Sequence, residues 1–143
     1  MKSLVRRIEI ETQHDTETIN ITETVRQIVA ESSLQNGLVL VSSLHTTTAI
    51  TVNEGLPDIE ADIVAVMERL APAEGIYRHA RFLPSDGQMA VNAACHLRSA
   101  LLGFQCLFPL ENGQMVMGGR QTIYFLELDG PQSRTYIVQV LGE

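Results

Sequence analysis

Apolar side chains recur along this chain with two different periods, and each period predicts a different element. Residues 5–12 alternate, with Ile8, Ile10 and Thr12 on one side and charged residues on the other, which is typical of a half-buried strand in an antiparallel sheet. Residues 57–70 instead repeat apolar side chains every three to four positions, which predicts an amphipathic helix that ends before Pro72. We expect its apolar stripe to pack on the core (Ile59, Ile63, Val66, Met67 and Leu70).

Two shorter helices are also predicted. Thr22 can cap a helix over residues 22–33, whose core stripe includes Val25 and Ile28, because a threonine oxygen can accept from a free N–H of the first turn. Asn92 can cap a second helix over residues 93–102, and Gly103 ends it. We expect the core stripe of this second helix to be Ala93, Leu97 and Leu101.

The other apolar runs predict strands joined by turns or loops. Asn112-Gly113 separates two of these runs and Asp129-Gly130-Pro131 separates two others, and both are turn sequences. A polar loop that contains Asp86-Gly87 follows Pro72. The expected strands cover residues 38–44, 49–52, 104–110, 114–117, 121–128 and 135–141. Residues 1–143 are therefore expected to form a single compact α+β domain of mainly antiparallel sheet with about three helices.

Composition narrows the class of partner. The net charge of −7, the 5% aromatic content and the absence of tryptophan argue against a nucleic-acid binder, which needs basic and stacking side chains. No apolar run approaches the roughly 20 residues of a membrane-spanning helix, and the basic residues 1–7 lack the apolar stretch of a signal peptide. With only two cysteines, a cytoplasmic protein is expected. Its partners should be a small molecule and other copies of itself.

Three of the four histidines are candidates for one metal site. His45 shares strand parity with buried positions, His96 follows Asn92 by one helical turn, and His79 lies in the polar loop. Three imidazoles suit a divalent metal such as zinc, with the fourth position open for water or substrate. The alternative is that each is an ordinary surface or hydrogen-bonded histidine, because no His-x-x-x-His or Cys-x-x-Cys spacing is present.

Two acidic residues and a threonine run are further candidates. Glu127 has the strand parity of Ile123 and Phe125, so burial can make it an acid, a base or the partner of a histidine. Glu54, before Gly55, is a second acid/base candidate. Thr46-Thr47-Thr48 offers hydroxyl and N–H groups to an anion. The alternatives are an edge position for Glu127, a plain turn for Glu54 and a β-rich turn for the threonines.

Several short motifs, in this order, resemble the YjbQ-like family, an uncharacterised family associated with a secondary thiamine-phosphate synthase activity. They span nearly the whole chain: His45-Thr46-Thr47-Thr48-Ala49, Val52-Asn53-Glu54, Asp62, Tyr77-Arg78-His79, Asn92-Ala93-Ala94-Cys95-His96-Leu97, Leu102-Gly103, Gly118 with Gln121, and Glu127-Leu128-Asp129-Gly130-Pro131. The resemblance implies a compact homotrimer with a histidine cluster on His45, His79 and His96. A trimer can complete such a site at a subunit interface.

Three positions depart from the family pattern. Ala94 stands where the family has an acid, Arg120 where it has tryptophan, and Gln132 where it has arginine. The last change removes a phosphate-binding side chain, for which Arg120 or Arg134 could substitute.

The resemblance implies an enzyme that joins a pyrimidine diphosphate to a thiazole phosphate and releases pyrophosphate. The alternatives are a metal-dependent hydrolase or lyase acting on a phosphorylated metabolite, and a non-catalytic trimer that binds a metal or an anion. Three groups of site residues are expected. They are the catalytic group (Glu127, Glu54 and Asn92), the substrate- or anion-binding group (Thr46, Thr47, Thr48, Asn53 and Arg134) and the metal ligands (His45, His79 and His96).

Overall fold

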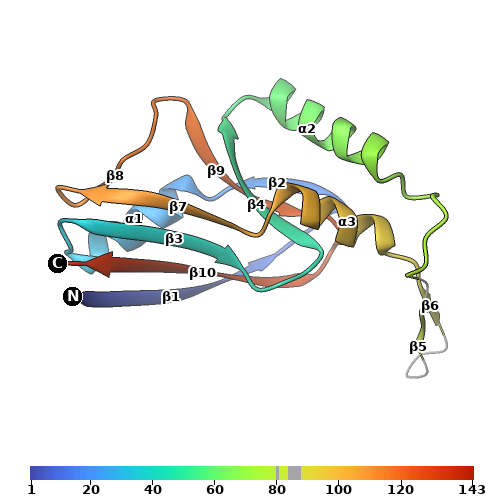
Figure 1. Ribbon diagram of the computed structural model, residues 1–143, viewed down its shortest axis with the longest axis horizontal. Coiled ribbons are helices and arrows are strands. Elements are labelled where there is room, and N and C mark those ends of the chain that lie inside the picture. The colour runs from blue at the N-terminus through green and yellow to red at the C-terminus, as the bar shows by residue number, and fades with distance from the viewer. Residues whose placement is uncertain (80, 84–87) are drawn as a thin grey trace.

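Two larger antiparallel sheets, a two-stranded hairpin and three helices make up the part of the chain that the computed structural model describes (Figure 1). That part comprises residues 1–79, 81–83 and 88–143, with the side chains of residues 81–83 and 88–90 left aside. Asp86-Gly87, expected in a loop, lies outside the described residues. An α+β fold built mainly of antiparallel sheet with three helices confirms the expected fold class.

The larger sheet has five strands in the order β1-β10-β3-β7-β8. Every pairing in it is antiparallel, and the chain-terminal strands β1 and β10 pair along their whole length. The turn between β7 and β8 contains Asn112-Gly113, both residues with positive φ, as expected for a tight hairpin. The strands are β1 (Lys2–Glu11), β3 (Gly37–Ser43), β7 (Gln105–Glu111), β8 (Gln114–Met115) and β10 (Ser133–Gly142).

The smaller sheet has the order β2-β9-β4, with β2 (Glu17–Asn20), β4 (Thr48–Glu54) and β9 (Gln121–Glu127). Its central strand, β9, is buried from Ile123 to Glu127. The two faces of this strand therefore lie in separate apolar clusters, which explains its continuous apolar run. A short hairpin of β5 (Arg81–Leu83) and β6 (Gln88–Ala90) lies in the segment expected to be a loop.

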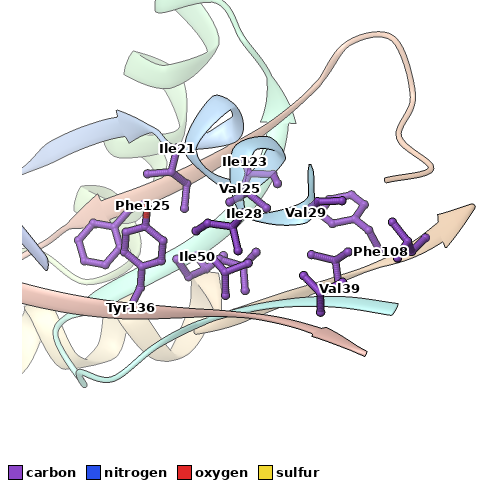
Figure 2. Close-up of a cluster of buried hydrophobic side chains, with 14 of the residues drawn as sticks. Ile21, Val25, Ile28, Val29, Val39, Ile50, Phe108, Ile123, Phe125 and Tyr136 are labelled. Atoms are coloured by element: carbon purple, nitrogen blue, oxygen red, sulfur yellow. The ribbon is translucent and has the colours of Figure 1, made fainter. Parts of the chain in front are cut away.

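Helix α1 (Thr22–Ser32) fills the space between the two sheets (Figure 2). Val25, Ile28 and Val29 are buried against both sheets, for example against Val39 of β3 and Ile123 of β9. The predicted stripe of this helix is confirmed. The predicted cap is wrong by one position, because the N-cap is Ile21 and Thr22 is already helical.

Helices α2 (Pro57–Leu70) and α3 (Ala93–Leu102) lie outside the smaller sheet (Figure 1). Their boundaries agree with the prediction, but of their predicted core stripes only Ala93 of α3 is buried. No residue of α2 is buried, and Leu97 and Leu101 of α3 are 44% and 59% exposed. Within one chain, small residues and Arg98 of α3 are buried instead. None of the described helices is long and apolar enough to cross a membrane.

Candidate functional site

The sequence-predicted site residues are divided between the two ends of β4. Thr48 begins this strand beside the end of β9, whereas Asn53 and Glu54 end it. At about 3.3 Å per residue, the strand separates the two groups by roughly 20 Å. Glu54 there pairs with exposed Arg120 at 3.1 Å, and Asn53 Oδ1 accepts from the Glu54 N–H. We call the other end of β4, which carries Thr48 and the loop with His45, the histidine end. Asn53 and Glu54 do not belong to it.

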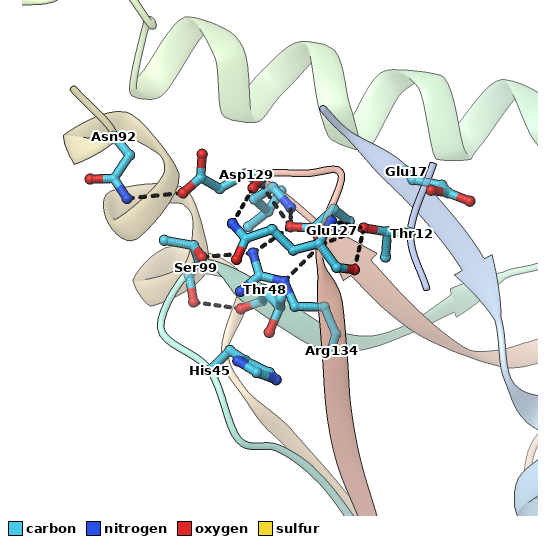
Figure 3. Close-up of polar contacts among 12 residues, drawn as sticks. Thr12, Glu17, His45, Thr48, Asn92, Ser99, Glu127, Asp129 and Arg134 are labelled. Atoms are coloured by element: carbon cyan, nitrogen blue, oxygen red, sulfur yellow. Dashed lines mark hydrogen bonds and ion pairs between the residues drawn. The ribbon is translucent and has the colours of Figure 1, made fainter. Parts of the chain in front are cut away.

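A buried ion pair stabilises the histidine end (Figure 3). Arg134 donates to both carboxylate oxygens of Glu127, from Nε at 2.7 Å and from a terminal nitrogen at 2.6 Å. Thr12 Oγ1 and the backbone N–H groups of Leu128 and Asp129 donate to the same carboxylate. Glu127 is fully buried and Arg134 is 4% exposed. Such a fork-shaped, charge-assisted contact is strong and geometrically specific.

The surroundings of Glu127 keep its carboxylate ionised. Burial alone would raise the pKa of Glu127, but the hydrogen bonds from Arg134, Asp129 and Thr12 and the arginine charge hold that pKa below its usual value. The expectation that Glu127 is drawn into a buried setting is confirmed. Its carboxylate accepts five hydrogen bonds from within the fold, which fix the ends of β9 and β10. No hydrogen bond joins it to a histidine among the described residues.

Two of the three threonines expected to bind an anion are used inside the fold. Thr47 Oγ1 accepts from Arg134, and Thr48 Oγ1 forms a 2.5 Å hydrogen bond with Ser43 Oγ. Thr47 and Thr48 are buried, and only Thr46 is exposed. Arg134, also expected to bind substrate, is occupied by Glu127. The network thus shapes the loop between β3 and β4 and leaves Thr46 as its accessible hydroxyl.

His45 lies in that loop and is also hydrogen-bonded within the fold. Its Nε2 accepts from the backbone N–H of Thr135 at 2.8 Å, so the ring proton of the neutral form sits on Nδ1. Burial first, and then the positive charge of Arg134, lower the pKa of His45 against a smaller opposing effect of Glu127. His45 is therefore a neutral imidazole whose Nε2 is engaged.

His79 and His96 meet edge to face. Their ring centroids are 4.9 Å apart and their planes are inclined by 77°. With a metal–nitrogen distance of about 2.0–2.1 Å, two imidazoles on one tetrahedral ion have centroids roughly 5 Å apart. The centroid separation thus agrees with two ligands of one metal, and it is equally that of an ordinary edge-to-face ring contact.

Among residues 1–79, 81–83 and 88–143, no third ligand joins this pair. No set of three histidine, cysteine or carboxylate side chains suited to a metal occurs in the described ranges. The expectation that His45, His79 and His96 meet within one chain is therefore not met. The alternative, a site shared between subunits, stays a prediction.

Asn92 links the histidine pair to the end of β9. It precedes α3, one helical turn before His96, and its Nδ2 donates to Asp129 Oδ2 at 2.9 Å (Figure 3). Its side chain makes no capping hydrogen bond, so it faces Asp129 instead. Asn92 Oδ1 is buried and has no partner among the described residues. A buried acceptor of this kind is costly unless a ligand or water satisfies it.

Relatives support the assignment of this chain to a family. Residues 6–143 match the model of the UPF0047 protein YjbQ-like family. The chain belongs to the YjbQ-like family. This YjbQ-like protein is 39% identical to a UPF0047 protein of Archaeoglobus fulgidus over 132 residues, which are 92% of this chain and 97% of the relative. It is 31% identical to the UPF0047 protein YugU of Bacillus subtilis over 140 residues, 97% of this chain and all of the relative.

Solved structures agree with this assignment. A YbjQ-like protein of unknown function from Sulfolobus solfataricus superposes with a TM-score of 0.91 at 32% identity, and 99% of each chain is covered. A hypothetical protein of Aeropyrum pernix gives a TM-score of 0.87 at 30% identity, covering 98% of this chain and 99% of that one. The fold of this YjbQ-like protein is therefore that of its family.

Two residues at this end of the YjbQ-like fold were missed as site candidates. Asp129 was predicted only as part of a turn, and Arg98 was not singled out. Asp129 belongs to a motif that carries the family resemblance, and that motif is the signal that could have found it. A helical arginine such as Arg98 has no distinguishing spacing in a sequence. Gln132 donates from Nε2 to the Asp129 carbonyl oxygen.

Proposed function

We propose that this YjbQ-like protein is a small-molecule enzyme whose site lies at the N-terminal end of α3. The observation that carries this proposal is the His79–His96 pair beside the Asn92–Asp129 contact, in which Asn92 Oδ1 lacks a partner among the described residues. Proton-transferring imidazoles next to an unsatisfied buried acceptor are what a substrate site requires and a purely structural cluster does not.

The reaction we propose resembles that of secondary thiamine-phosphate synthases. It joins a pyrimidine diphosphate to a thiazole phosphate and releases pyrophosphate. The free Oδ1 of Asn92 suits an amino group of a heterocycle, because an amide oxygen accepts from N–H donors. His79 and His96 can donate N–H groups to a departing phosphate oxygen. Thr46 offers an exposed hydroxyl at the same end of the molecule.

We further propose a divalent metal such as zinc on the His79–His96 pair, with the remaining protein ligands supplied by a neighbouring copy. The centroid separation of 4.9 Å supports two ligands. When bound, such an ion would polarise a phosphate or carbonyl oxygen. Metal analysis of the purified protein tests this, since His79→Ala and His96→Ala should each lose the metal and His14→Ala should keep it. Equal metal content in all four proteins would rule out this pair as the ligands.

The neighbouring copy belongs to the homotrimer that the family resemblance implies, which we place in the cytoplasm as part of the same proposal. Apolar residues of α3 and of the strand that follows it support self-association, because they are exposed in the single chain (Leu97, Leu101, Phe104 and Leu107). Light scattering should give three times the 15.8 kDa chain mass. Leu101→Asp should reduce that mass to a monomer, whereas Ala30→Asp on α1 should not. A wild-type monomer at micromolar concentration would contradict the trimer.

The synthase proposal is tested by pyrophosphate release from a pyrimidine diphosphate in the presence of a thiazole phosphate. His96→Ala and Asn92→Ala should each lower the rate by roughly 10²-fold or more, as expected when a proton-transfer or transition-state contact is lost. Gln27→Ala, on the exposed side of α1, serves as the control. A wild-type protein without turnover, or a His96→Ala protein as active as wild type, would end this assignment.

Metal-assisted hydrolysis or lyase chemistry on a phosphorylated metabolite is the second candidate. The His79–His96 pair supports it, because a metal held there would lower the pKa of a bound water molecule. Phosphate release from such metabolites without the thiazole substrate would identify this reaction. Tight binding without turnover of any substrate would favour the third candidate, a non-catalytic trimer that binds a metal or an anion.

A further inference from the structure

A cleft of about 1130 Å³ adjoins Asp129 on the side of α3 that carries Cys95 and Arg98. Residues 13–16, between β1 and β2, and residues 72–74, after α2, complete its walls. Asp129 thus lines the cleft and also accepts from Asn92 in the proposed site. A ligand in the cleft would lie directly beside that site.

Arg98 is the unusual feature of this cleft. It is only 7% exposed, and its Nε donates to the Ala71 carbonyl oxygen at 2.9 Å. Its two terminal nitrogens have no hydrogen-bond partner, and no carboxylate forms an ion pair with it, among the described residues. These nitrogens are not among the fully buried atoms that lack a partner, so they reach solvent, where an anionic ligand could replace water as their partner.

Arg134 and Arg98 differ in the partners of their guanidinium groups. Arg134 is similarly buried, at 4% exposure, but its Nε and one terminal nitrogen both reach the Glu127 carboxylate, and that same nitrogen also donates to Thr47, whereas its other terminal nitrogen has no partner among the described residues. Arg98 presents the same forked group with only Nε satisfied. The pair of free terminal nitrogens matches the spacing of two oxygens of a phosphate or carboxylate group.

Acidic side chains also line the cleft. Asp15, Glu68, Glu74 and Asp129 contribute to its walls, and none lies within 4.0 Å of the Arg98 guanidinium. The cleft therefore offers one buried cation and several carboxylates, of which Asp15, Glu68 and Glu74 are exposed. These charges favour a ligand that is anionic at one end and cationic elsewhere, and they disfavour a polyanion.

We infer that Arg98 is the anion-binding residue of this cleft and takes the phosphate group of a small molecule that also carries a positive charge. The inference deepens the proposed function and rests on it for the link between cleft and reaction. It also supplies the phosphate contact that Arg134 and Arg120 do not, because both are paired.

Phosphocholine, which carries a phosphate and a quaternary ammonium group, is the probe. Titrated into the purified protein at constant ionic strength, it should give a saturable NMR shift of the Arg98 Nε–H signal, assigned by its loss in Arg98→Lys. Arg98→Met should weaken binding at least tenfold, in keeping with the loss of a charge-assisted hydrogen-bond pair. Arg69→Met, which removes an exposed arginine of α2, should leave binding unchanged. Glycerol 3-phosphate, which lacks the cation, should bind several-fold more weakly than phosphocholine.

Three results would overturn the inference. They are an Arg98 signal that phosphocholine does not move, equal binding by wild type and Arg98→Met, and glycerol 3-phosphate binding as tightly as phosphocholine. The first is measured on the wild-type protein and stands even if Arg98→Met fails to fold. Because the titration needs no turnover, binding without synthase activity supports this inference and contradicts only the proposed reaction. Synthase activity that is unchanged in Arg98→Met supports the proposed reaction and contradicts this inference.

Discussion

Helices α1 and α2 both place apolar side chains along one face, at the same helical spacing. In α1 that face is sealed, and Val25, Ile28 and Val29 are 0–4% exposed. In α2 no residue is buried, and Leu70 is 62% exposed. The difference lies in position, because α1 is enclosed by two sheets whereas α2 lies on the outside of the smaller one (Figure 1).

An amphipathic pattern thus identifies the apolar face of a helix, but it does not identify the part of the protein that packs against that face. The chain itself covers α1. For α2 and α3 it supplies only the small cluster around Tyr124 and Leu126, to which Ile63 and Leu102 add partial contacts. For α3 we propose above that another copy of the chain supplies the remaining cover, whereas α2 is expected to stay open to solvent.

Removing a charge from the buried Glu127–Arg134 pair should lower the free energy of unfolding more than any other change proposed here. Arg134→Met leaves Glu127 buried without its partner, and breaking one side of a buried pair costs about 3–5 kcal/mol of unfolding free energy. Arg120→Met breaks the exposed pair with Glu54 and should cost about 1 kcal/mol or less. Urea unfolding measures both. Equal losses in the two variants would contradict the distinction between sealed and open regions.

The pH dependence of these proteins sharpens the same test. In wild type the pKa of Glu127 is lowered in the folded state, so its stabilising contribution is present above the ordinary glutamate value and is lost as pH falls through the folded value. In Arg134→Met, burial without the arginine raises that pKa. The folded variant then tolerates the protonated form, so its deficit relative to wild type should shrink at acid pH. A deficit that grows at acid pH would contradict this assignment.

An apolar truncation in each helix compares the two faces directly. Ile28→Ala, in the sealed core, should lower the unfolding free energy by about 2–5 kcal/mol, because it leaves a cavity. Leu70→Ala, on the exposed face of α2, should change it by about 0.5 kcal/mol or less. Both are measured by urea unfolding, with light scattering to follow the mass. A loss of several kcal/mol in Leu70→Ala would show that α2 is sealed after all.

The smallest expected effect concerns His45. Because its pKa is lowered in the folded state, its contribution is present above the ordinary value of 6.5 and is lost as pH falls through the folded value. Protonation removes the acceptor of the Thr135 N–H, so wild type should lose about 1 kcal/mol on going from about pH 7 to about pH 5. His45→Gln should lack this decrease, whereas His14→Gln, an exposed control, should retain it. The same decrease in both variants would exclude His45 as its source.

Most elements could be predicted from the sequence, because their signals are local. Pro57 and Pro72 bracket α2, Gly103 follows α3, and Asn112-Gly113 forms the turn between β7 and β8. The candidate site was predicted less well. Asn92 and His96 lie together because one helical turn joins them, but Glu54 and Asn53 lie at the far end of β4 from Thr48. The partners of Glu127, Thr47 and Arg98 come from distant segments and leave no periodic signal.

The sequence by itself determined the positions of helices and turns, the apolar face of α1 and the membership of a family, because each depends on neighbours along the chain or on an ordered set of motifs. Only the tertiary structure decided how Arg134 and Arg98 differ, since both are arginines with similar burial. One meets a carboxylate seven residues away, and the other faces a cleft. Which charges are satisfied depends on packing between segments, and local sequence patterns do not specify that packing.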